Sequence, residues 1–596
     1  MSIKIKLFNH QSNLQNNKID NFLNPKGSVL ITSVIFITIV MALTLGYYRT
    51  VMGERINYLS RLAKIQAHYN AENGLGKNYG YIASGTFVDT VFGSSEIKEM
   101  SGGVLKVNFF DTTATNLRTN FIGNAIGYAT YPGFDGKPIQ VTDTAQIAYQ
   151  PVGFEEYMYF SDRELPGGGP WLGATVKFGG TDDLEGKIFS NDVIQIGAGN
   201  GCPTFDENAE VGTAKVFNYN NGCNESGVFG SGDNEITHRD SMPEIEWPPF
   251  VGQDRVKSHA THTFTANQFI LAPGSTDRDK LVMTDIQFFD DYYVVKQWKY
   301  VQPPYTSAFI FNAADRDSLK KDYPLKYAQM YNPNAYGPNV GGYDSYRDWP
   351  LFDVDNQAPA NFLDYVTYQQ IFSNEDVIWI EGGQVRVSGT VRGRFTIATS
   401  GPQLYRMHFD NATIDTLFTN IWLTDDLVYA DSQTSGAVTE GSTNRMGLLS
   451  GANIIIANTF PNGKKNSAIA SNIKINAAMI AMDESFVVQY WQNSTAGYYF
   501  LDGQFIKGDG RGGSAFNNTG TNDYRGNIII YGSVIQSKRG YVKRNQTGPY
   551  NIMSGIGYDK DYNYDYNLRD YPPPSWPEMR TNDGSVNLTL ASYGVN

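Results

Sequence analysis

The hydrophobic and polar positions of the chain form a first clear pattern close to the N-terminus. Residues 29–48 are uncharged and are dominated by Val, Ile, Leu, Met and Phe, and Arg49 ends the run. A helix of about twenty apolar residues crosses the hydrocarbon core of a bilayer, and it satisfies its own backbone hydrogen bonds inside lipid. The run is too long for the apolar core of a secretory signal, and no small-residue cleavage site follows it. The pattern therefore predicts one membrane-spanning helix.

A second pattern continues this helix beyond the apolar run. Between residues 49 and 75, apolar side chains recur mostly at steps of three and four, at Ile56, Leu59, Leu62, Ala63, Ile65 and Tyr69. This spacing predicts an amphipathic helix that leaves the membrane. Gly74 and Gly76 follow, and glycine is common just past the end of a helix. We therefore expect the helical region to occupy residues 28–80, with these glycines marking its end.

Short alternating segments follow the helix and are typical of β-strands. Residues 104–109 and 140–149 alternate apolar and polar side chains, as antiparallel strands with one solvated face do. They predict a small sheet over residues 81–165 that packs on the helix. Residues 166–375 contain further strands rich in Gly and Asp, and most of the proline in segments that we interpret as connections or insertions.

Four copies of one local pattern stand out farther along the chain. In each copy an Asn precedes an apolar stretch that begins with Ile, at Asn420, Asn453, Asn472 and Asn527. Stacked rungs of a parallel β-solenoid require such stretches, because each rung leaves its inner face unburied until the next rung covers it. Asn side chains repeated at one corner can also hydrogen-bond along the stack. The copies are unevenly spaced, so we expect an elongated solenoid over residues 376–545 with insertions; an antiparallel sandwich is the alternative.

The residues before the apolar run indicate its orientation. They are rich in Asn and Gln and carry four lysines against one acidic residue, Asp20, at Lys4, Lys6, Lys18 and Lys26. The positive-inside bias holds such a segment in the cytoplasm, so the rest of the chain would be exported. The sequence Lys26-Gly27-Ser28 before an apolar helix resembles the substrate of a prepilin peptidase, which would cut between Gly27 and Ser28. The alternative is an uncleaved signal anchor in which Gly27 is incidental.

Residues 24–80 as a whole resemble the N-terminal region of PilX-type minor pilins, which are type IV pilus assembly proteins. The family pattern is Arg-Gly, an apolar helix, a short Arg/Glu segment and then Ala-x-x-x-Ala-Glu-x-Gly-Leu. In this chain the last motif falls on Ala67, Ala71, Glu72, Gly74 and Leu75. The resemblance implies a pilin-like helix and sheet, with other pilin-like subunits as partners.

One position departs from the pattern of major pilins. Their fifth residue after the cut is a glutamate, to which the resemblance assigns pairing with the N-terminal amine of a neighbouring subunit within the membrane. Here that position is Thr32, counting Ser28 as the first residue. A charge at membrane depth costs about 2.5 to 3.5 kcal/mol and is kept only where it finds a partner. A neutral Thr32 suits an initiating or tip-located minor pilin; alternatively, it packs in a lipid helix and hydrogen-bonds its own backbone.

Composition limits the function of the exported part. At 596 residues the chain is too long for one compact pilin head. Its 39 Tyr, 34 Phe and 60 Gly, with 18% charged residues, are typical of a β-rich chain with many turns. A net charge of −13 argues against nucleic acid as a partner. Cys202 and Cys223 are the only cysteines and lie beyond the membrane, so we expect them to form a disulfide.

The sequence offers little catalytic chemistry. His259 and His262 lie in an alternating segment, where a three-residue step places the two rings on opposite faces of a strand and disfavours a zinc site. We interpret several acidic residues as solvated turns between rungs, with calcium binding or sugar cleavage as alternatives, at Asp425, Asp426, Asp483, Glu484 and Asp502. No nucleotide-binding loop or serine nucleophile elbow stands in a supporting context. We therefore expect a protein that is not an enzyme and has no cofactor.

Residues 557–577 are rich in Tyr and Asp and end in a proline-rich sequence that includes Trp576. They resemble a C-terminal signature of large PilX-like envelope proteins, with a core at residues 565–569. We expect this stretch to cap the open end of the solenoid, because an uncovered rung exposes unpaired strand edges. A sugar- or surface-binding patch of Tyr and Trp is the alternative.

Together these patterns predict a mainly β protein with one long N-terminal helix. Its expected parts are a leader, a pilin-like helix, a pilin-like sheet, a β-rich region with the disulfide, solenoid rungs and a cap, over residues 1–27, 28–80, 81–165, 166–375, 376–545 and 546–596. The expected function is structural and adhesive, in the inner membrane and then in or at the tip of a type IV pilus-like filament. Its partners would be membrane lipid, prepilin peptidase, pilin-like subunits and a surface ligand or glycan. The alternatives are a membrane-tethered β-helix enzyme acting on polysaccharide and a single-pass envelope protein without a filament.

Overall fold

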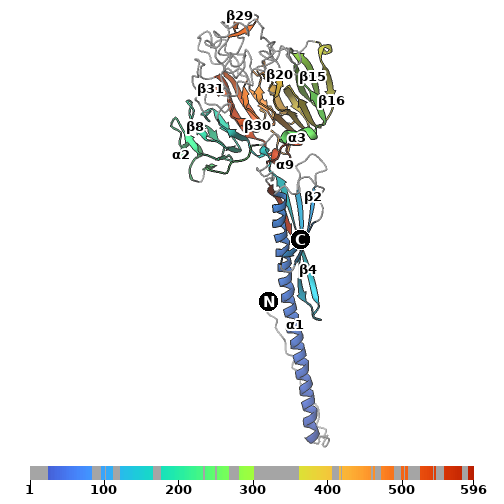
Figure 1. Ribbon diagram of the computed structural model, residues 1–596. Coiled ribbons are helices and arrows are strands. Elements are labelled where there is room, and N and C mark those ends of the chain that lie inside the picture. The colour runs from blue at the N-terminus through green and yellow to red at the C-terminus, as the bar shows by residue number, and fades with distance from the viewer. Residues whose placement is uncertain are drawn as a thin grey trace, which may run out of the picture.

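The computed structural model consists of a long helix, a small antiparallel sheet packed on it and a large β-rich body (Figure 1). The predicted mainly β fold with one long N-terminal apolar helix is therefore confirmed. The structure describes residues 25–83, 95–100, 103–111, 121–164, 176–232, 235–247, 251–266, 281–300, 361–405, 415–417, 419–457, 459, 461–462, 472–488, 498–501, 504–507, 524–540, 542–544, 556–579 and 588–595.

Helix α1 (Pro25–Ala83) is a single helix of 59 residues. It passes through Gly74 and Gly76, where we expected it to end. A glycine inside a helix costs about 1 kcal/mol relative to alanine, but Gly74 and Leu75 are buried. Tertiary packing of this kind supplies most helix stability in proteins, so it outweighs the local stop signal. The predicted leader before Pro25 lies outside the described residues.

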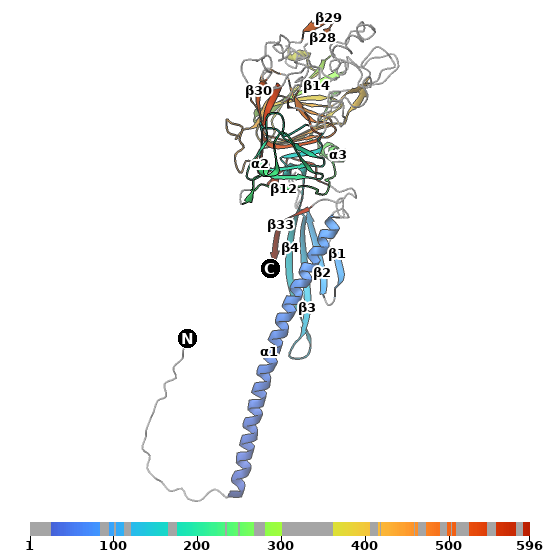
Figure 2. The same ribbon diagram turned by 90° about the vertical axis from the view of Figure 1, so that its left-hand side faces the viewer.

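Five antiparallel strands form the sheet beside α1, in the spatial order β1, β2, β3, β4, β33. Their bounds are Ser95–Met100, Gly103–Asp111, Phe121–Pro132, Pro138–Pro151 and Leu588–Val595. β33 comes from the C-terminal end of the chain, in the region that we expected to act as a cap, and it pairs with β4 (Figure 2). The whole body is therefore inserted between the fourth and fifth strands of this sheet.

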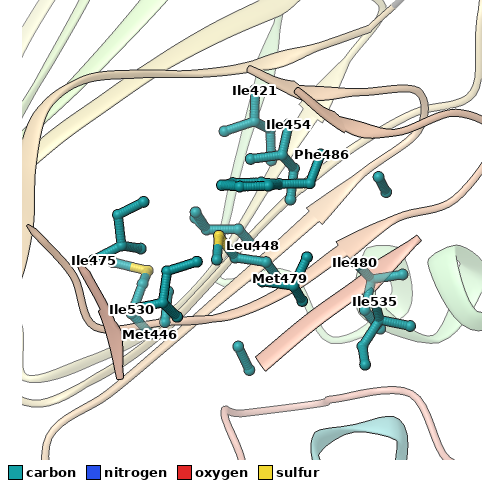
Figure 3. Close-up of a cluster of buried hydrophobic side chains, with 14 of the residues drawn as sticks. Ile421, Met446, Leu448, Ile454, Ile475, Met479, Ile480, Phe486, Ile530 and Ile535 are labelled. Atoms are coloured by element: carbon teal, nitrogen blue, oxygen red, sulfur yellow. The ribbon is translucent and has the colours of Figure 1, made fainter. Parts of the chain in front are cut away.

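The largest ladder of the body is parallel throughout. Its strands, in spatial order, are β13 (His262–Thr265), β17 (Glu375–Glu381), β19 (Arg394–Thr399), β23 (Arg445–Ser450), β26 (Ala478–Ala481), β30 (Tyr524–Lys538), β5 (Tyr159–Arg163), β7 (Lys187–Ser190), β10 (Glu210–Thr213) and β12 (Thr237–Arg239). Residues in register stack on one another, as Ile480 and Ile535 do (Figure 3). This stacking places apolar side chains of successive strands in contact and builds the core.

A second group of parallel strands lies against the first. Its spatial order begins with β14 (Leu281–Asp290), β18 (Gln384–Val391) and β22 (Ile421–Tyr429). β22 then divides the ladder, because its first half pairs with β24 (Ile454–Ile456) and its second half with β25 (Ile473–Ile475). β24 continues to β27 (Phe486–Val488), whereas β25 continues to β30, β32 (Ile556–Tyr564), β6 (Asp182–Leu184) and β9 (Thr204–Phe205). At the far edge, β15 (Tyr292–Tyr300) and β16 (Thr367–Ile371) add antiparallel strands.

The four Asn-Ile pairs lie at two corners of the body. The backbone N–H of Asn453 donates to Oδ1 of Asn420 at 3.0 Å, and that of Ser485 donates to Oδ1 of Asn453 at 3.1 Å. At the second corner, the N–H of Asn527 donates to Oδ1 of Asn472 at 2.9 Å. Asn420 and Asn453 are fully buried, so these side chains satisfy backbone donors that water cannot reach.

The chain enters the large ladder at its middle rather than at an end. β5 is the first strand of the body, and it pairs with β7 on one side and with β30 on the other. After β12 at one end, the chain returns along the ladder to β13 at the other end. Along this returning segment, the side chain of Asn191 forms hydrogen bonds with the backbone of Ile245. The indole of Trp247 donates to the carbonyl oxygen of Met482 at 2.8 Å.

Residues 565–579 lie against the outside of β19 and β23. The buried guanidinium of Arg445 donates to the carbonyl oxygens of Asn567 and Tyr571, at 2.8 and 2.6 Å. The hydroxyl of Thr396 donates to the carbonyl oxygen of Pro574 at 2.6 Å. The stretch thus covers the side of strands within the ladder, not the terminal β12 or β13 where an end cap would lie. The reason is topological, because the chain leaves the body from the middle of the ladder.

Candidate membrane and assembly helix

The N-terminal half of α1 has no cover from the rest of the described chain. Its side chains are exposed from Val29 to Leu62 apart from a few that are half-buried, and they include Leu30, Phe36 and Leu43. The apolar window has a mean hydropathy of 2.5 and is 0% buried, and the helix is long and apolar enough to cross a membrane. Contiguous apolar surface of this size on a soluble protein marks a site of contact with membrane or protein.

Hydroxyl groups in the apolar run bond to the helix itself. The side chains of Ser33, Thr38 and Thr44 donate to the carbonyl oxygens four residues earlier, at 2.7, 2.7 and 2.6 Å. Thr32 donates to the carbonyl oxygen of Val29 at 3.2 Å, which is the backbone bond that one interpretation of its sequence position expected. Polar groups bonded in this way lower the cost of placing the helix in lipid.

The motif residues lie where α1 meets the sheet. Ala67, Ala71, Gly74 and Leu75 are buried, and Glu72 is half-buried with an oxygen 3.4 Å from Nε2 of His68. Gly27 and Ser28, at the expected cut, lie within α1 shortly after its first residue. The structure thus places the small residues of the motif on the side of the helix that faces the sheet.

Gly127 in β3 explains why these residues are small. A Cβ atom built at Gly127 would lie 1.9 Å from the carbonyl oxygen of Ala67 and 2.5 Å from the amide nitrogen of Ala71. No side chain larger than hydrogen fits there without moving the helix. Sequence reasoning missed Gly127, although a glycine inside an alternating strand often marks a close approach of another backbone.

Polar contacts fix the helix on either side of this point. The amide of Asn70 donates to the carbonyl oxygen of Tyr128 at 2.8 Å. Nδ1 of His68 lies 3.0 Å from Oδ2 of Asp143 in β4. Because these bonds are directional, they set the position of α1 along the sheet as well as its distance.

A second candidate site, the predicted disulfide, lies in the part of the body near β12. Cys202 and Cys223 are bonded to each other. They follow β8 (Ile194–Ile196) and β11 (Phe217–Tyr219), which form a separate parallel pair. The bond therefore joins two adjacent layers of the body.

Replacing both cysteines with serine should lower the free energy of unfolding of this part of the body by roughly 3 kcal/mol, because the closed loop restricts the unfolded chain. We expect protease cleavage within residues 194–229 at lower urea concentration than in the wild type. The β3–β4 hairpin, far from the disulfide, serves as the internal control. Equal protection of residues 194–229 in both proteins would contradict the prediction.

The candidate metal ligands are dispersed. His259 precedes β13, whereas His262 begins it and lies 3.6 Å from Asp376. Among the acidic corners, Asp426 accepts from the backbone N–H of Lys474 and Glu484 pairs with Lys538. Asp502 lies outside the described residues. Among the residues that are described, no group of three His, Cys, Asp or Glu side chains is arranged to hold a metal ion.

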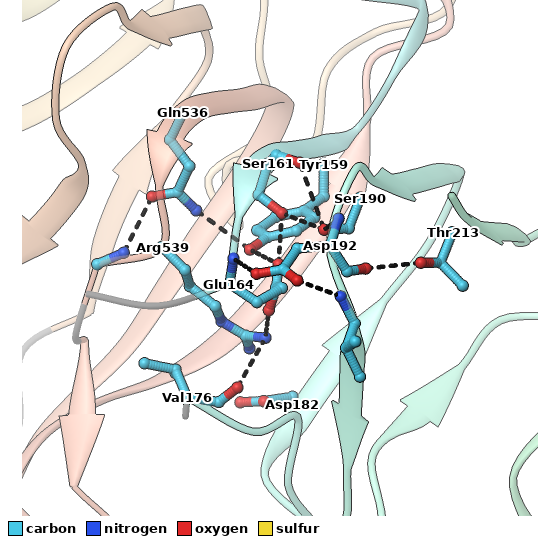
Figure 4. A network of polar contacts seen from close by, with 12 residues as sticks. Tyr159, Ser161, Glu164, Val176, Asp182, Ser190, Asp192, Thr213, Gln536 and Arg539 are labelled. Atoms are coloured by element: carbon cyan, nitrogen blue, oxygen red, sulfur yellow. Dashed lines mark hydrogen bonds and ion pairs between the residues drawn. The ribbon is translucent and has the colours of Figure 1, made fainter. Parts of the chain in front are cut away.

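Charged side chains just past the ends of β5 and β30 meet at a junction that we call the seam. The guanidinium of Arg539 donates to one oxygen of Glu164, and the hydroxyls of Tyr159 and Ser161 donate to the other (Figure 4). Arg539 and Glu164 are both buried. Burial alone would lower the pKa of Arg539, but the carboxylate of Glu164 raises it above its ordinary value.

A second ion pair lies next to the first. Nζ of Lys560 in β32 lies 2.8 Å from Oδ2 of Asp182 in β6. Burial lowers the pKa of Lys560. The guanidinium of Arg539 also stacks on the ring of Phe178, 3.7 Å from its centre. The seam is therefore a buried, charged junction at the point where β5 and β30 pair.

Comparison of the chain with protein-family models, with curated proteins and with solved structures finds no match. The features that indicate a function are therefore α1 and its sheet, together with the resemblance of residues 24–80 described above. The body contributes its size, its topology and its attachment to that sheet.

Proposed function

We propose that this protein is a minor-pilin-like surface subunit. Its helix α1 anchors the chain in the inner membrane and later packs into a type IV pilus-like filament, from which the body projects. The observation that carries the proposal is the division of α1 at Ala63. Before this residue the helix is uncovered and is apolar as far as Tyr48, and from Ala63 onward it packs against a small sheet.

The exposed side of α1 beyond the membrane supports a helical partner. Tyr58, Leu62, Ile65 and Tyr69 are exposed, and they recur at alternating steps of four and three residues. At about 100° per residue they lie opposite the buried alanines. A stripe with this spacing suits packing against a second helix, as another pilin-like subunit would supply.

We further propose that the body is a parallel β-solenoid with an adhesive role. Its parallel ladders, stacked side-chain columns and Asn corners support this architecture. The stacked strands of the body lie above α1 and its sheet, with β8 and β15 toward opposite sides in Figure 1. Such a placement presents both ends of the stack and one long side to a surface ligand or glycan.

Processing at Gly27 tests the pilin assignment. A Gly27→Phe substitution should leave residues 1–27 on the chain, because a prepilin peptidase requires a small residue at the cut. Intact mass and the N-terminal residue of protein isolated from membranes give the answer. Gly46→Phe is the control, since a Cβ at Gly46 has nothing within 4 Å. Wild-type protein that begins at Met1 would contradict the assignment. So would a Gly27→Phe variant whose mature mass equals that of the cleaved wild type.

Two other results would replace the proposal. Failure to recover any pilin-like subunit after crosslinking and isolation of the full chain would favour a single-pass envelope protein without a filament. Turnover of uronate or neutral polysaccharides by the full chain would favour a membrane-tethered enzyme.

A further inference from the structure

The β3–β4 hairpin extends along α1 toward the N-terminus of the helix. Gly127 lies against Ala67 and Ala71, whereas Ala129 packs with Ala63, so β3 runs toward earlier helix residues. Beyond Ala129 the strand continues to Pro132, and a short turn leads into β4 at Pro138. Figure 2 shows this turn beside α1, on the side of the sheet away from the body.

The length of the hairpin brings its turn close to the expected membrane surface. From Ala129 to Phe134 the chain advances roughly 17 Å at about 3.4 Å per residue, equal to about 11 helical residues at 1.5 Å each. The turn therefore reaches the level of residue 52 or so in α1. That level is about 6 Å from Tyr48, the last residue of the apolar run, and the headgroup layer is about 5 to 7 Å thick.

The turn carries the side chains that suit a lipid surface. Phe134 is 70% exposed, and Ile139 is also exposed. Lys137 is exposed beside them and pairs with Asp135 at 3.6 Å, so the turn itself carries no net charge. Backbone bonds hold the turn in shape, from the N–H of Gly133 to the carbonyl oxygen of Lys137 at 2.8 Å and from that of Gly136 to Gly133 at 3.0 Å. Because the turn already has this shape, the ring of Phe134 can move from water into lipid without a conformational change of the backbone.

The neighbouring part of α1 adds positive charge. Close to the end of the apolar run it carries two exposed basic residues, Arg49 and Arg55, against Glu54. Lipid phosphates and anionic headgroups attract Lys and Arg at this depth, and aromatic rings are enriched there. The charge and the exposed ring are thus complementary to one partner, a phospholipid surface.

We propose that the β3–β4 turn, residues 133–139, is a second membrane contact of this protein. Phe134 enters the headgroup layer, while Arg49 and Arg55 of α1 face lipid phosphates. This inference rests on the proposed membrane placement of α1. A contact on one side of the helix would hold the sheet and the body in a fixed orientation over the membrane before assembly.

Fluorescence of labelled full-length protein in nanodiscs, with one chain in each disc, tests the contact. Single cysteines replace Met41, Phe134 or Phe372 and carry an environment-sensitive dye, while the native disulfide stays oxidised. Phe372 is the matched control, because it is 70% exposed like Phe134 but lies in the body. We expect spin-labelled lipid to quench the dye at residues 41 and 134, several-fold more than at residue 372.

The labels at residues 41 and 134 distinguish the membrane contact of the turn from the membrane placement of α1. Quenching at residue 41 but not at residue 134 would overturn the membrane contact and leave the placement of α1 intact. Absence of quenching at residue 41 would overturn that placement and the proposed function with it. Protection of the dye at residue 134 only in assembled filaments would assign Phe134 to a neighbouring subunit instead of lipid. Stronger quenching at residue 134 in anionic than in zwitterionic discs would support the role of the basic residues.

Discussion

A Gly127→Ala substitution is expected to loosen α1 from its sheet. The new methyl group would meet the carbonyl oxygen of Ala67 and the amide nitrogen of Ala71, which are backbone atoms and cannot rotate away. Overpacking of this kind typically costs about 1 to 3 kcal/mol, and occasionally more. Amide hydrogen exchange over residues 63–75, measured by mass spectrometry on the detergent-solubilised chain, should accelerate about tenfold or more.

Gly53→Ala is the matched control for this prediction. Gly53 lies in α1, the helix whose exchange is measured, and a Cβ there has nothing within 4 Å. Alanine stabilises a helix interior by about 1 kcal/mol relative to glycine, so exchange in this variant should be unchanged or slower. If both substitutions had the same effect, close packing at Gly127 would not be what holds the helix.

Breaking the buried ion pair at the seam should have the second large effect. Glu164→Leu or Arg539→Met alone leaves one buried charge without its partner, which typically costs about 3 to 5 kcal/mol. We expect a corresponding loss in the free energy of unfolding of the body, followed in urea by tryptophan fluorescence. The double variant should recover much of the loss, because it removes both charges together.

An exposed ion pair provides the comparison. The guanidinium of Arg392 pairs with Asp290 at 2.6 Å, but their side chains are 56% and 52% exposed. Such surface pairs are worth about 0 to 1 kcal/mol, so Arg392→Met should scarcely change the stability. Losses at Glu164 and Arg539 no larger than this, or simple addition in the double variant, would show that the seam does not depend on its charges.

Local signals in the sequence predicted where strands of the body lie, but not which strands pair with one another. The Asn-Ile pairs correctly identify where strands β22, β24, β25 and β30 lie, because a corner Asn and an apolar strand are properties of a few adjacent residues. The pairs divide into two columns, Asn420 with Asn453 and Asn472 with Asn527. That division depends on where β22 changes its partner from β24 to β25 and on the insertions between strands, which no local pattern specifies.

The order of the strands in space could not be predicted from the sequence for the same reason. β5 lies beside β30, and β33 lies beside β4, although hundreds of residues separate them along the chain. The alternation of apolar and polar residues within each of these strands does not indicate which strand it pairs with. The polar residues of the seam, Glu164 and Arg539, likewise resemble ordinary surface charges until the fold brings them together in the core.

The N-terminal region was more predictable, because its signals are continuous. The length of the apolar run and the spacing of small residues in the motif both depend on one helix. The end of that helix was predicted wrongly at Gly74 and Gly76, since burial against the sheet is a tertiary effect. Gly127 and the β3–β4 turn escaped notice because their roles depend on the distance to α1.

We propose that one apolar helix serves first as a membrane stem and later as a contact between subunits. A photo-crosslinking residue at Leu43, which is 68% exposed, tests it most directly in cells. We expect adducts with lipid in the membrane fraction and adducts with another pilin-like chain in sheared surface filaments. Adducts with lipid alone, from a chain that never enters the filament fraction, would contradict it.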